Sequence, residues 1–160
     1  MENSLTIEIA ENRFQFAACV YIRSIVFFGE QNVPFSEEIN EEEDCAVYYI
    51  GWYNGLPAST ARYRILPDNI GKIERVATLK EHRGRGFGKT LLGQIINDLM
   101  GNTKLQKIKL SSQDHAISFY ERLGFKTIGN GFMEAGIPHH LMFLDAPFQT
   151  GSDHNRNSVA

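Results

Sequence analysis

The sequence of 160 residues lacks the features that mark several classes of protein. Its two cysteines, Cys19 and Cys45, are too few for a disulfide framework and form no C-x-x-C pair. Lys and Arg number 16 against 19 Asp and Glu, so the basic surplus of a general nucleic-acid binder is missing. No apolar run approaches the roughly 18 residues of a membrane span, and residues 1–4 lack the basic start of a secretory signal. We therefore expect a cytoplasmic protein with no nucleic-acid and no membrane partner.

The spacing of the apolar residues predicts both strands and helices. Residues 5–9 alternate as in a half-buried strand, and apolar residues recur at helical spacing from Phe14 to Val26, up to a stop near Gly29. The Asn54-Gly55 turn between two β-rich runs predicts a hairpin. The further expected elements are strands at 72–79 and 108–110, a helix with a buried face from Leu91 to Leu99, a helix at 116–123 with Asp114 as its N-cap, and short last strands broken at 129–131 and 136–138.

The resulting order, β-α-β-β-β-α-β-α-β-β, is typical of an α+β fold with a mixed sheet. Residues 30–44 are expected to form a loop, whose acidic run at 41–44 is either solvated or steers a cationic amine toward the protein. We place one domain at residues 1–146. Residues 147–160 are polar, and we expect them to form a flexible tail.

The most informative segment is an apolar strand end at 76–78 followed by a glycine-rich turn at 83–90. Glycine permits close approach of a ligand, and the start of the next helix presents free N–H groups, so phosphate or pyrophosphate is the expected guest. A nucleotide P-loop needs a glycine where Arg83 stands, and Lys89 occupies the last glycine position of a dinucleotide fingerprint. The spacing that fits is R-x-x-G-x-G, and the alternative is a turn that serves packing alone.

This loop resembles the acyl-CoA pyrophosphate loop of the GNAT superfamily of N-acetyltransferases. Residues 112–125 resemble the second CoA-side motif of that family, A-x-x-F-Y-x-x-x-G-F, with Gln113 where an Asn is usual. Residues 23–34 resemble the R-x-x-V-F-x-x-E-Q-x-x-P signature of the ElaA-like branch, and residues 136–142 resemble its G-I-P-H-x-x-M ending. One departure is Tyr48, which stands where the branch would have a histidine.

The resemblance implies a central, mostly antiparallel twisted sheet of about six or seven strands flanked by helices, and acetyl-CoA as co-substrate. The implied activity is transfer of an acetyl group to a primary amine, on a small molecule or a protein lysine, with a homodimer left open. A non-catalytic acyl-CoA-binding or regulatory module is the alternative. The residues expected to bind the cofactor are Val76, Ala77, Thr78, Arg83, Gly84, Arg85, Gly86, Phe87, Gly88, Lys89, Thr90, Gln113, Ala116 and Phe119.

Catalysis requires the amine to lose a proton and the CoA thiolate to gain one. Tyr120 is the candidate acid, because the resemblance places a hydroxyl near the CoA sulfur there; its alternative role is that of a core aromatic. Glu74 is the leading candidate base, since it shares strand parity with Val76 and Thr78. The alternative for Glu74 is a carboxylate paired with a neighbouring arginine, Arg62 or Arg64.

Two residues of the branch-specific motifs, Glu30 and His139, are rival bases, and a chain of water molecules is a third route for the proton. Arg23 and Gln31 are candidate substrate-binding residues. Arg23 or Arg75 could orient the turn that carries Glu30 and Gln31, and the alternative for each arginine is a solvated charge. The five histidines show no metal-ligand spacing, so we expect no metal.

Overall fold

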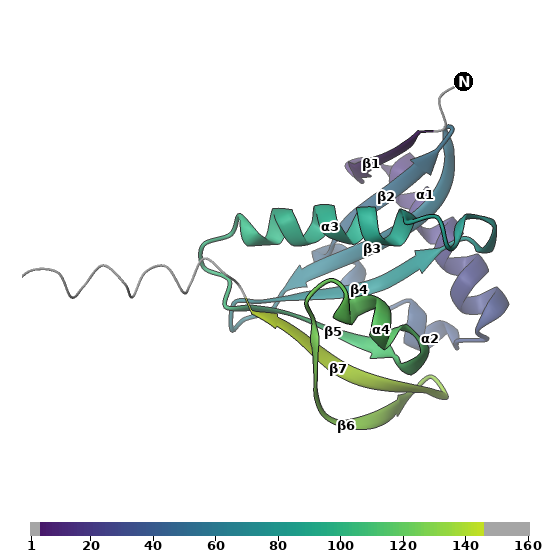
Figure 1. Cartoon of the computed structure of the whole chain (residues 1–160). Coiled ribbons are helices and arrows are strands. Elements are labelled where there is room, and N and C mark those ends of the chain that lie inside the picture. Colours follow the sequence, from purple (N-terminus) through teal and green to yellow (C-terminus); the bar gives the residue numbers. More distant parts are fainter. Residues whose placement is uncertain (1–3, 146–160) are drawn as a thin grey trace, which may run out of the picture.

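The computed structural model describes residues 4–145, and the expected tail at 147–160 lies outside this range. Seven strands form one mixed sheet in the order β1-β2-β3-β4-β5-β7-β6 (Figure 1). Every neighbouring pair is antiparallel except β4 and β5, which confirms the predicted α+β fold. The strands are β1 (Leu5–Ile9), β2 (Val47–Tyr53), β3 (Leu56–Ile65), β4 (Ile70–Thr78), β5 (Lys107–Gln113), β6 (Lys126–Glu134) and β7 (Ile137–Asp145).

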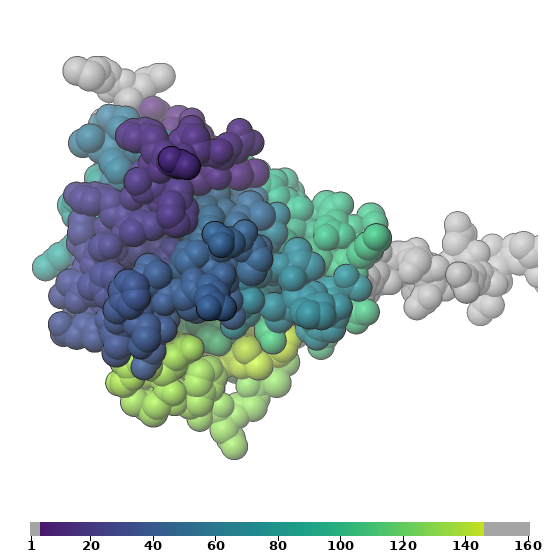
Figure 2. All heavy atoms as spheres, turned by 180° about the vertical axis from the view of Figure 1, so that it is seen from behind, coloured from purple at the N-terminus to yellow at the C-terminus, as the bar shows by residue number. Residues whose placement is uncertain are grey.

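Helices cover both faces of the sheet (Figure 1). On one face α3 (Phe87–Met100) and α4 (Ile117–Glu121) pack on a core that includes Tyr49, Ile108 and Met142. On the other face α1 (Arg13–Arg23) packs on Tyr48, Ile50 and Ala77. Figure 2 shows this second face, where the purple-to-blue residues of the first third of the chain cover the sheet. Every helix within residues 4–145 is too short or too polar to cross a membrane.

The α1 helix begins with a capping box, in which Asn12 accepts from the Gln15 backbone and the Gln15 side chain accepts from that of Asn12. The chain continues into a π-helical segment, η1 (Ser24–Glu30). The predicted apolar face of this helix is wrong at four positions, because Phe14, Ala17, Tyr21 and Ile25 are exposed. Phe14 nevertheless contacts the protein by stacking on Trp52.

The segment predicted as a loop at 30–44 contains two short helices, α2 (Phe35–Glu38) and the 3-10 helix η2 (Glu41–Cys45). The predicted break at 129–131 is a register shift inside one continuous strand, β6. The predicted break at 136–138 is limited to the turn, since Pro138 belongs to β7. Asp114 does not cap a helix; its carboxylate lies 2.7 Å from Nδ1 of His140.

A bulge in β4 determines where the site lies. Arg75 adopts φ 56°, and the register with β3 shifts between Thr60 and Arg62. As a result Ile73 and Val76 both pack on the α3 side, whereas Ala77 packs on the α1 side. The predicted common face of Glu74 and Val76 is therefore wrong, because the extra residue reverses the alternation between them.

Candidate active site

A cleft opens where β4 and β5 separate. The two strands pair only from Ile70 to Lys72, so the ends of both strands beyond this point are not paired with each other. The cleft has a volume of about 1210 Å³, and α4, the β6–β7 hairpin, α2 and η1 complete its walls. It brings together all of the predicted site residues except Arg85, Thr90 and Arg23.

The glycine loop enters the cleft at the first turn of α3. Gly84 and Gly86 adopt φ 73° and 80°, a region that favours glycine, and no atom of another residue would crowd a side chain there. Gly86 is the N-cap of α3 and carries no side chain that could cover the free N–H groups. The loop thus offers the backbone donors and the helix terminus that a phosphate group requires.

The two arginines of the loop have different contacts. Arg83 donates from Nε to the Thr78 carbonyl and from Nη2 to Glu30, at 2.9 and 2.6 Å. Arg85 instead lies over the Tyr53 ring, 4.4 Å from its centroid, and donates to the Tyr53 hydroxyl. The guanidinium of Arg83 therefore lies at the cleft, whereas that of Arg85 is held outside it.

Tyr120 is buried on α4 and lines the same cleft. Its ring packs edge-on against Phe119 and Phe125. Burial raises the pKa of the hydroxyl well above its usual range, so the group is protonated at neutral pH. Within residues 4–145 this hydroxyl forms no hydrogen bond, which leaves its proton available to a ligand.

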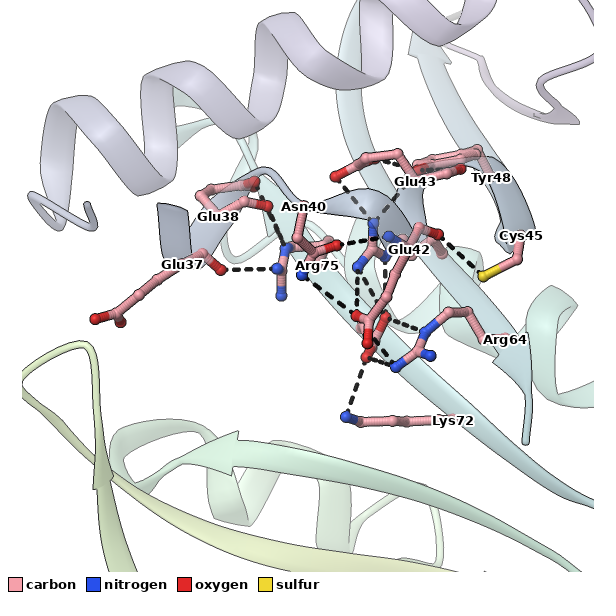
Figure 3. Close-up of polar contacts among 12 residues, drawn as sticks. Glu37, Glu38, Asn40, Glu42, Glu43, Cys45, Tyr48, Arg64, Lys72 and Arg75 are labelled. Atoms are coloured by element: carbon pink, nitrogen blue, oxygen red, sulfur yellow. Dashed lines mark hydrogen bonds and ion pairs between the residues drawn. The ribbon is translucent and has the colours of Figure 1, made fainter. Parts of the chain in front are cut away.

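Glu74 is part of an ion-pair network on the α1 side of the sheet. Figure 3 labels its members Arg64, Lys72 and Glu43. Its carboxylate lies 3.0 Å from Arg62, 2.8 Å from Arg64 and 3.1 Å from Lys72. Burial raises the pKa of Glu74, but the hydrogen bond from Arg64 and the charges of Arg62 and Lys72 outweigh it and lower this pKa to about 2. A carboxylate held this firmly as an anion is a poor proton acceptor, and the geometry matches the ion-pair alternative.

The network extends to η2 through Arg23, which is fully buried. Arg23 donates to both carboxylate oxygens of Glu38, at 2.7 and 2.5 Å, and to both oxygens of Glu43. The expected contact of Arg23 with the turn of Glu30 and Gln31 is wrong, because Glu38 and Glu43 use every donor nitrogen. Tyr48, in the position of the expected histidine, donates its hydroxyl proton to Glu43.

Three further predicted residues lie at the cleft. Gln31 and Gln113 exchange two amide hydrogen bonds, of 2.8 and 3.3 Å, across it. His139 is buried, its ring stacks on Phe132, and Nδ1 lies 2.7 Å from the Ile137 carbonyl. Since that carbonyl can only accept, Nδ1 carries a proton, and the second ring nitrogen, Nε2, faces the cleft with the Glu134 carboxylate 3.6 Å away.

Two features of the site were missed from the sequence. One is the role of Glu38, whose partners Arg23 on α1 and Arg75 on β4 are distant from it in the sequence. No sequence signal indicates the bulge at Arg75, because a non-glycine residue at positive φ leaves no pattern. Among residues 4–145 no group of three His, Cys, Asp or Glu side chains is arranged to hold a metal ion.

A mixed sheet that separates at its single parallel pair, with a glycine loop at the following helix, defines a protein with the acyl-CoA N-acyltransferase fold. The family model described as acetyltransferase (GNAT) family matches residues 16–125, and the chain belongs to this family. Both the predicted family and the likeness to ElaA are thereby confirmed.

Relatives and solved structures agree with this assignment. The uncharacterized N-acetyltransferase YjcF of Bacillus subtilis is 33% identical over 138 residues, which are 86% of this chain and 97% of that protein. Protein ElaA of Escherichia coli is 27% identical over 129 residues, 78% of this chain and 84% of ElaA. The crystal structure of Escherichia coli ElaA superposes with a TM-score of 0.74 at 22% identity, covering 89% of this chain and 99% of that one. An acyl-CoA N-acyltransferase from Pseudomonas aeruginosa gives a TM-score of 0.71 at 22% identity, with the same coverage.

Proposed function

We propose that this protein transfers an acetyl group from acetyl-CoA to a primary amine by direct attack. The observation that carries the proposal is that one cleft holds both the glycine loop and a buried, unpartnered Tyr120 hydroxyl. Family membership supports acyl transfer from an acyl-CoA. The acetyl group and the amine are inferences from the chemistry of the site.

The residues of the cleft fit acetyl-CoA. The N–H groups of residues 84–88 and the Arg83 guanidinium would hold the pyrophosphate, and the unpaired end of β4 at 76–78 would bind the pantetheine arm. When the cofactor binds, Gln113 would give up its hydrogen bonds to Gln31 and form hydrogen bonds to the amides of the pantetheine arm instead. Bound there, acetyl-CoA supplies the thioester that is attacked.

Two side chains move the protons. His139 Nε2 accepts the proton that the amine nitrogen loses as the new N–C bond forms. Tyr120 gives its proton to the sulfur as the C–S bond breaks, and no covalent link to the protein is formed. We prefer His139 to Glu30 because Glu30 is exposed and lies beside the Arg83 that would bind the pyrophosphate, whereas His139 is buried in the cleft. We prefer it to Glu74 because Glu74 is held as an anion by three cations.

The test is a steady-state assay of the purified protein with acetyl-CoA and a panel of amines. Release of the CoA thiol and the mass of the acetylated amine are measured together. We expect both with at least one amine, and a loss of about 10²-fold in kcat for His139→Gln at neutral pH. Binding of CoA by calorimetry without thiol release from any amine would establish the non-catalytic module instead.

A further inference from the structure

At the β4 bulge the cleft presents a guanidinium whose donors are only partly used. Arg75 lines the cleft at the β4 bulge, where its backbone is held at φ 56°. Its Nε and Nη2 donate to the carbonyls of Glu38 and Glu37, at 3.1 and 2.9 Å (Figure 3). Within residues 4–145 its third nitrogen, Nη1, forms no hydrogen bond. Backbone strain of this kind is typical of functional positions.

The charge of Arg75 is poorly balanced by the protein. Its nearest carboxylate, that of Glu38, lies 3.6 Å away but is already bound at both oxygens by Arg23. The carboxylate of Glu74, the residue before Arg75 on β4, is bound by three cations other than Arg75. Burial and the neighbouring charges of Arg62 and Arg23 lower the pKa of Arg75, and the carboxylates of Glu38 and Glu74 offset only part of this effect. An added anion at Nη1 would therefore be stabilised rather than repelled.

Arg75 lies where the reaction would take place. Arg75 directly precedes the 76–78 segment that we assign to the pantetheine arm, so its side chain lies at the thioester end of the cofactor path. His139, which we assign to the acceptor amine, lines the same cleft from β7. An acceptor that reaches both residues carries its amine on one side and an anion on the other.

We propose that the acceptor is an amine bearing a carboxylate, of which an amino acid is the simplest example, and that Arg75 Nη1 binds the carboxylate. This inference rests on the proposed acetyltransferase function. The carboxylates of Glu37 and Glu134 also line the cleft and would suit a second ammonium group. Both residues are exposed, however, so solvent screens them more than it screens Arg75, whose side chain is 21% exposed.

The experiment compares three kinds of acceptor with the wild-type protein: amino acids, the same amino acids as carboxamides, and linear diamines. A charged hydrogen bond of this kind discriminates by about 10- to 100-fold. We expect kcat/KM for the amino acid to exceed that for its amide by this factor. Amides or diamines that react as well as amino acids would overturn the proposal, whereas no thiol release from any amine would instead defeat the acetyltransferase function on which it rests.

Variants at Arg75 supply the second arm. Arg75→Gln should raise KM for the amino acid by about tenfold or more and leave the amide almost unchanged, while Arg75→Lys should recover part of the preference. Arg13→Gln, which removes a charge from an exposed position on α1, is the matched control. An equal loss of kcat with amino acid and amide would show that Arg75 polarises the thioester, and would overturn its assignment to the acceptor. If Arg75→Gln fails to fold, the wild-type comparison still decides.

Discussion

The proposed catalytic role of the Tyr120 hydroxyl can be tested separately from the packing of the Tyr120 ring, because one substitution removes the oxygen atom and leaves the ring. Tyr120→Phe keeps the ring contacts with Phe119 and Phe125 and removes only the proton donor. We expect kcat to fall by about 10²-fold, since the thiolate then leaves without a proton, and the Kd of acetyl-CoA to stay within about twofold. Stopped-flow or steady-state thiol release measures kcat, and calorimetry measures Kd.

Tyr21→Phe is the matched control for this variant, because Tyr21 is an exposed tyrosine on α1. It should leave both quantities unchanged. Full turnover by the Tyr120 variant would remove this hydroxyl from the mechanism.

The role of Glu74 could not be decided from the sequence. The sequence offered two roles for it, base or ion-pair partner, and strand parity favoured the first. The bulge at Arg75 reversed that parity and left Glu74 beside Arg62 and Arg64. The choice depended on one backbone angle that no side-chain pattern encodes.

The ion pairs of Glu74 predict an acid-dependent loss of stability. Because the folded-state pKa is lowered from 4.5 to about 2, the ionised carboxylate stabilises the fold above about pH 4.5, and this contribution disappears as the pH falls toward 2. Glu74→Gln should lower the free energy of unfolding by about 3 kcal/mol at pH 7, and the difference from wild type should shrink below pH 4.5. Urea unfolding at pH 7, 4 and 3 measures it.

Glu121→Gln, at an exposed position of α4, serves as the control and should behave like wild type at each pH. A difference between Glu74→Gln and wild type that stays constant from pH 7 to 3 would contradict the lowered pKa of Glu74.

At the scale of elements, the loop before α3 and the helix itself could be predicted because their signals are local: a glycine pattern, an apolar face and a stop at Gly101. The separation of β4 from β5 could not be predicted, because it depends on the residue at which pairing between two strands distant in sequence ends. The helix α2 also escaped prediction, since it is short and is held by Arg23 and Arg75 through contacts with Glu38.

The glycine loop predicts different outcomes for two alanine substitutions. A Cβ at Gly88 would lie 3.5 Å from Phe119 and 3.7 Å from Thr78, which are ordinary contacts, so Gly88→Ala should fold normally. Its methyl group would nevertheless stand at the helix start that the phosphates approach, and we expect CoA affinity to fall by about tenfold. Calorimetric titration with CoA tests this.

Gly93→Ala is the control within the same helix, where a Cβ meets no other atom within 4 Å. It should raise the free energy of unfolding by about 0.5–1 kcal/mol with CoA affinity unchanged. Equal affinity of the Gly88 and Gly93 variants for CoA would argue against phosphate binding at this turn.

The ion pair between Glu30 and Arg83 joins η1 to the glycine loop. If the pyrophosphate takes Arg83 as its partner, Glu30 competes with it, and Glu30→Gln should tighten CoA binding. An exposed ion pair contributes up to about 1 kcal/mol, so the expected gain in affinity is about two- to fivefold. Glu81→Gln, which removes an exposed charge before the same loop, should give a smaller gain. Equal gains from the two variants would mean that net charge, rather than this ion pair, sets the affinity.

At the scale of the whole molecule, the order of the elements predicted the α+β fold, the motifs predicted the family, and both predictions are confirmed. The charge network between η2 and the sheet was not predictable, since Arg23, Glu43 and Arg62 meet only after the chain has folded. A homodimer stays a prediction. The strand on which it rests is β6, an edge strand whose residues are all exposed.

The central claim is that the cleft between β4 and β5 passes an acetyl group directly from acetyl-CoA to an amine. A single-turnover experiment tests it, with the protein in excess over acetyl-CoA labelled in the acetyl group and an amine acceptor present. We expect all the label in the N-acetyl product, none on the protein at any time, and one CoA thiol released per product formed. Label that appears on the protein before the product would contradict direct attack, and label that stays in acetyl-CoA with every amine would contradict the transfer itself.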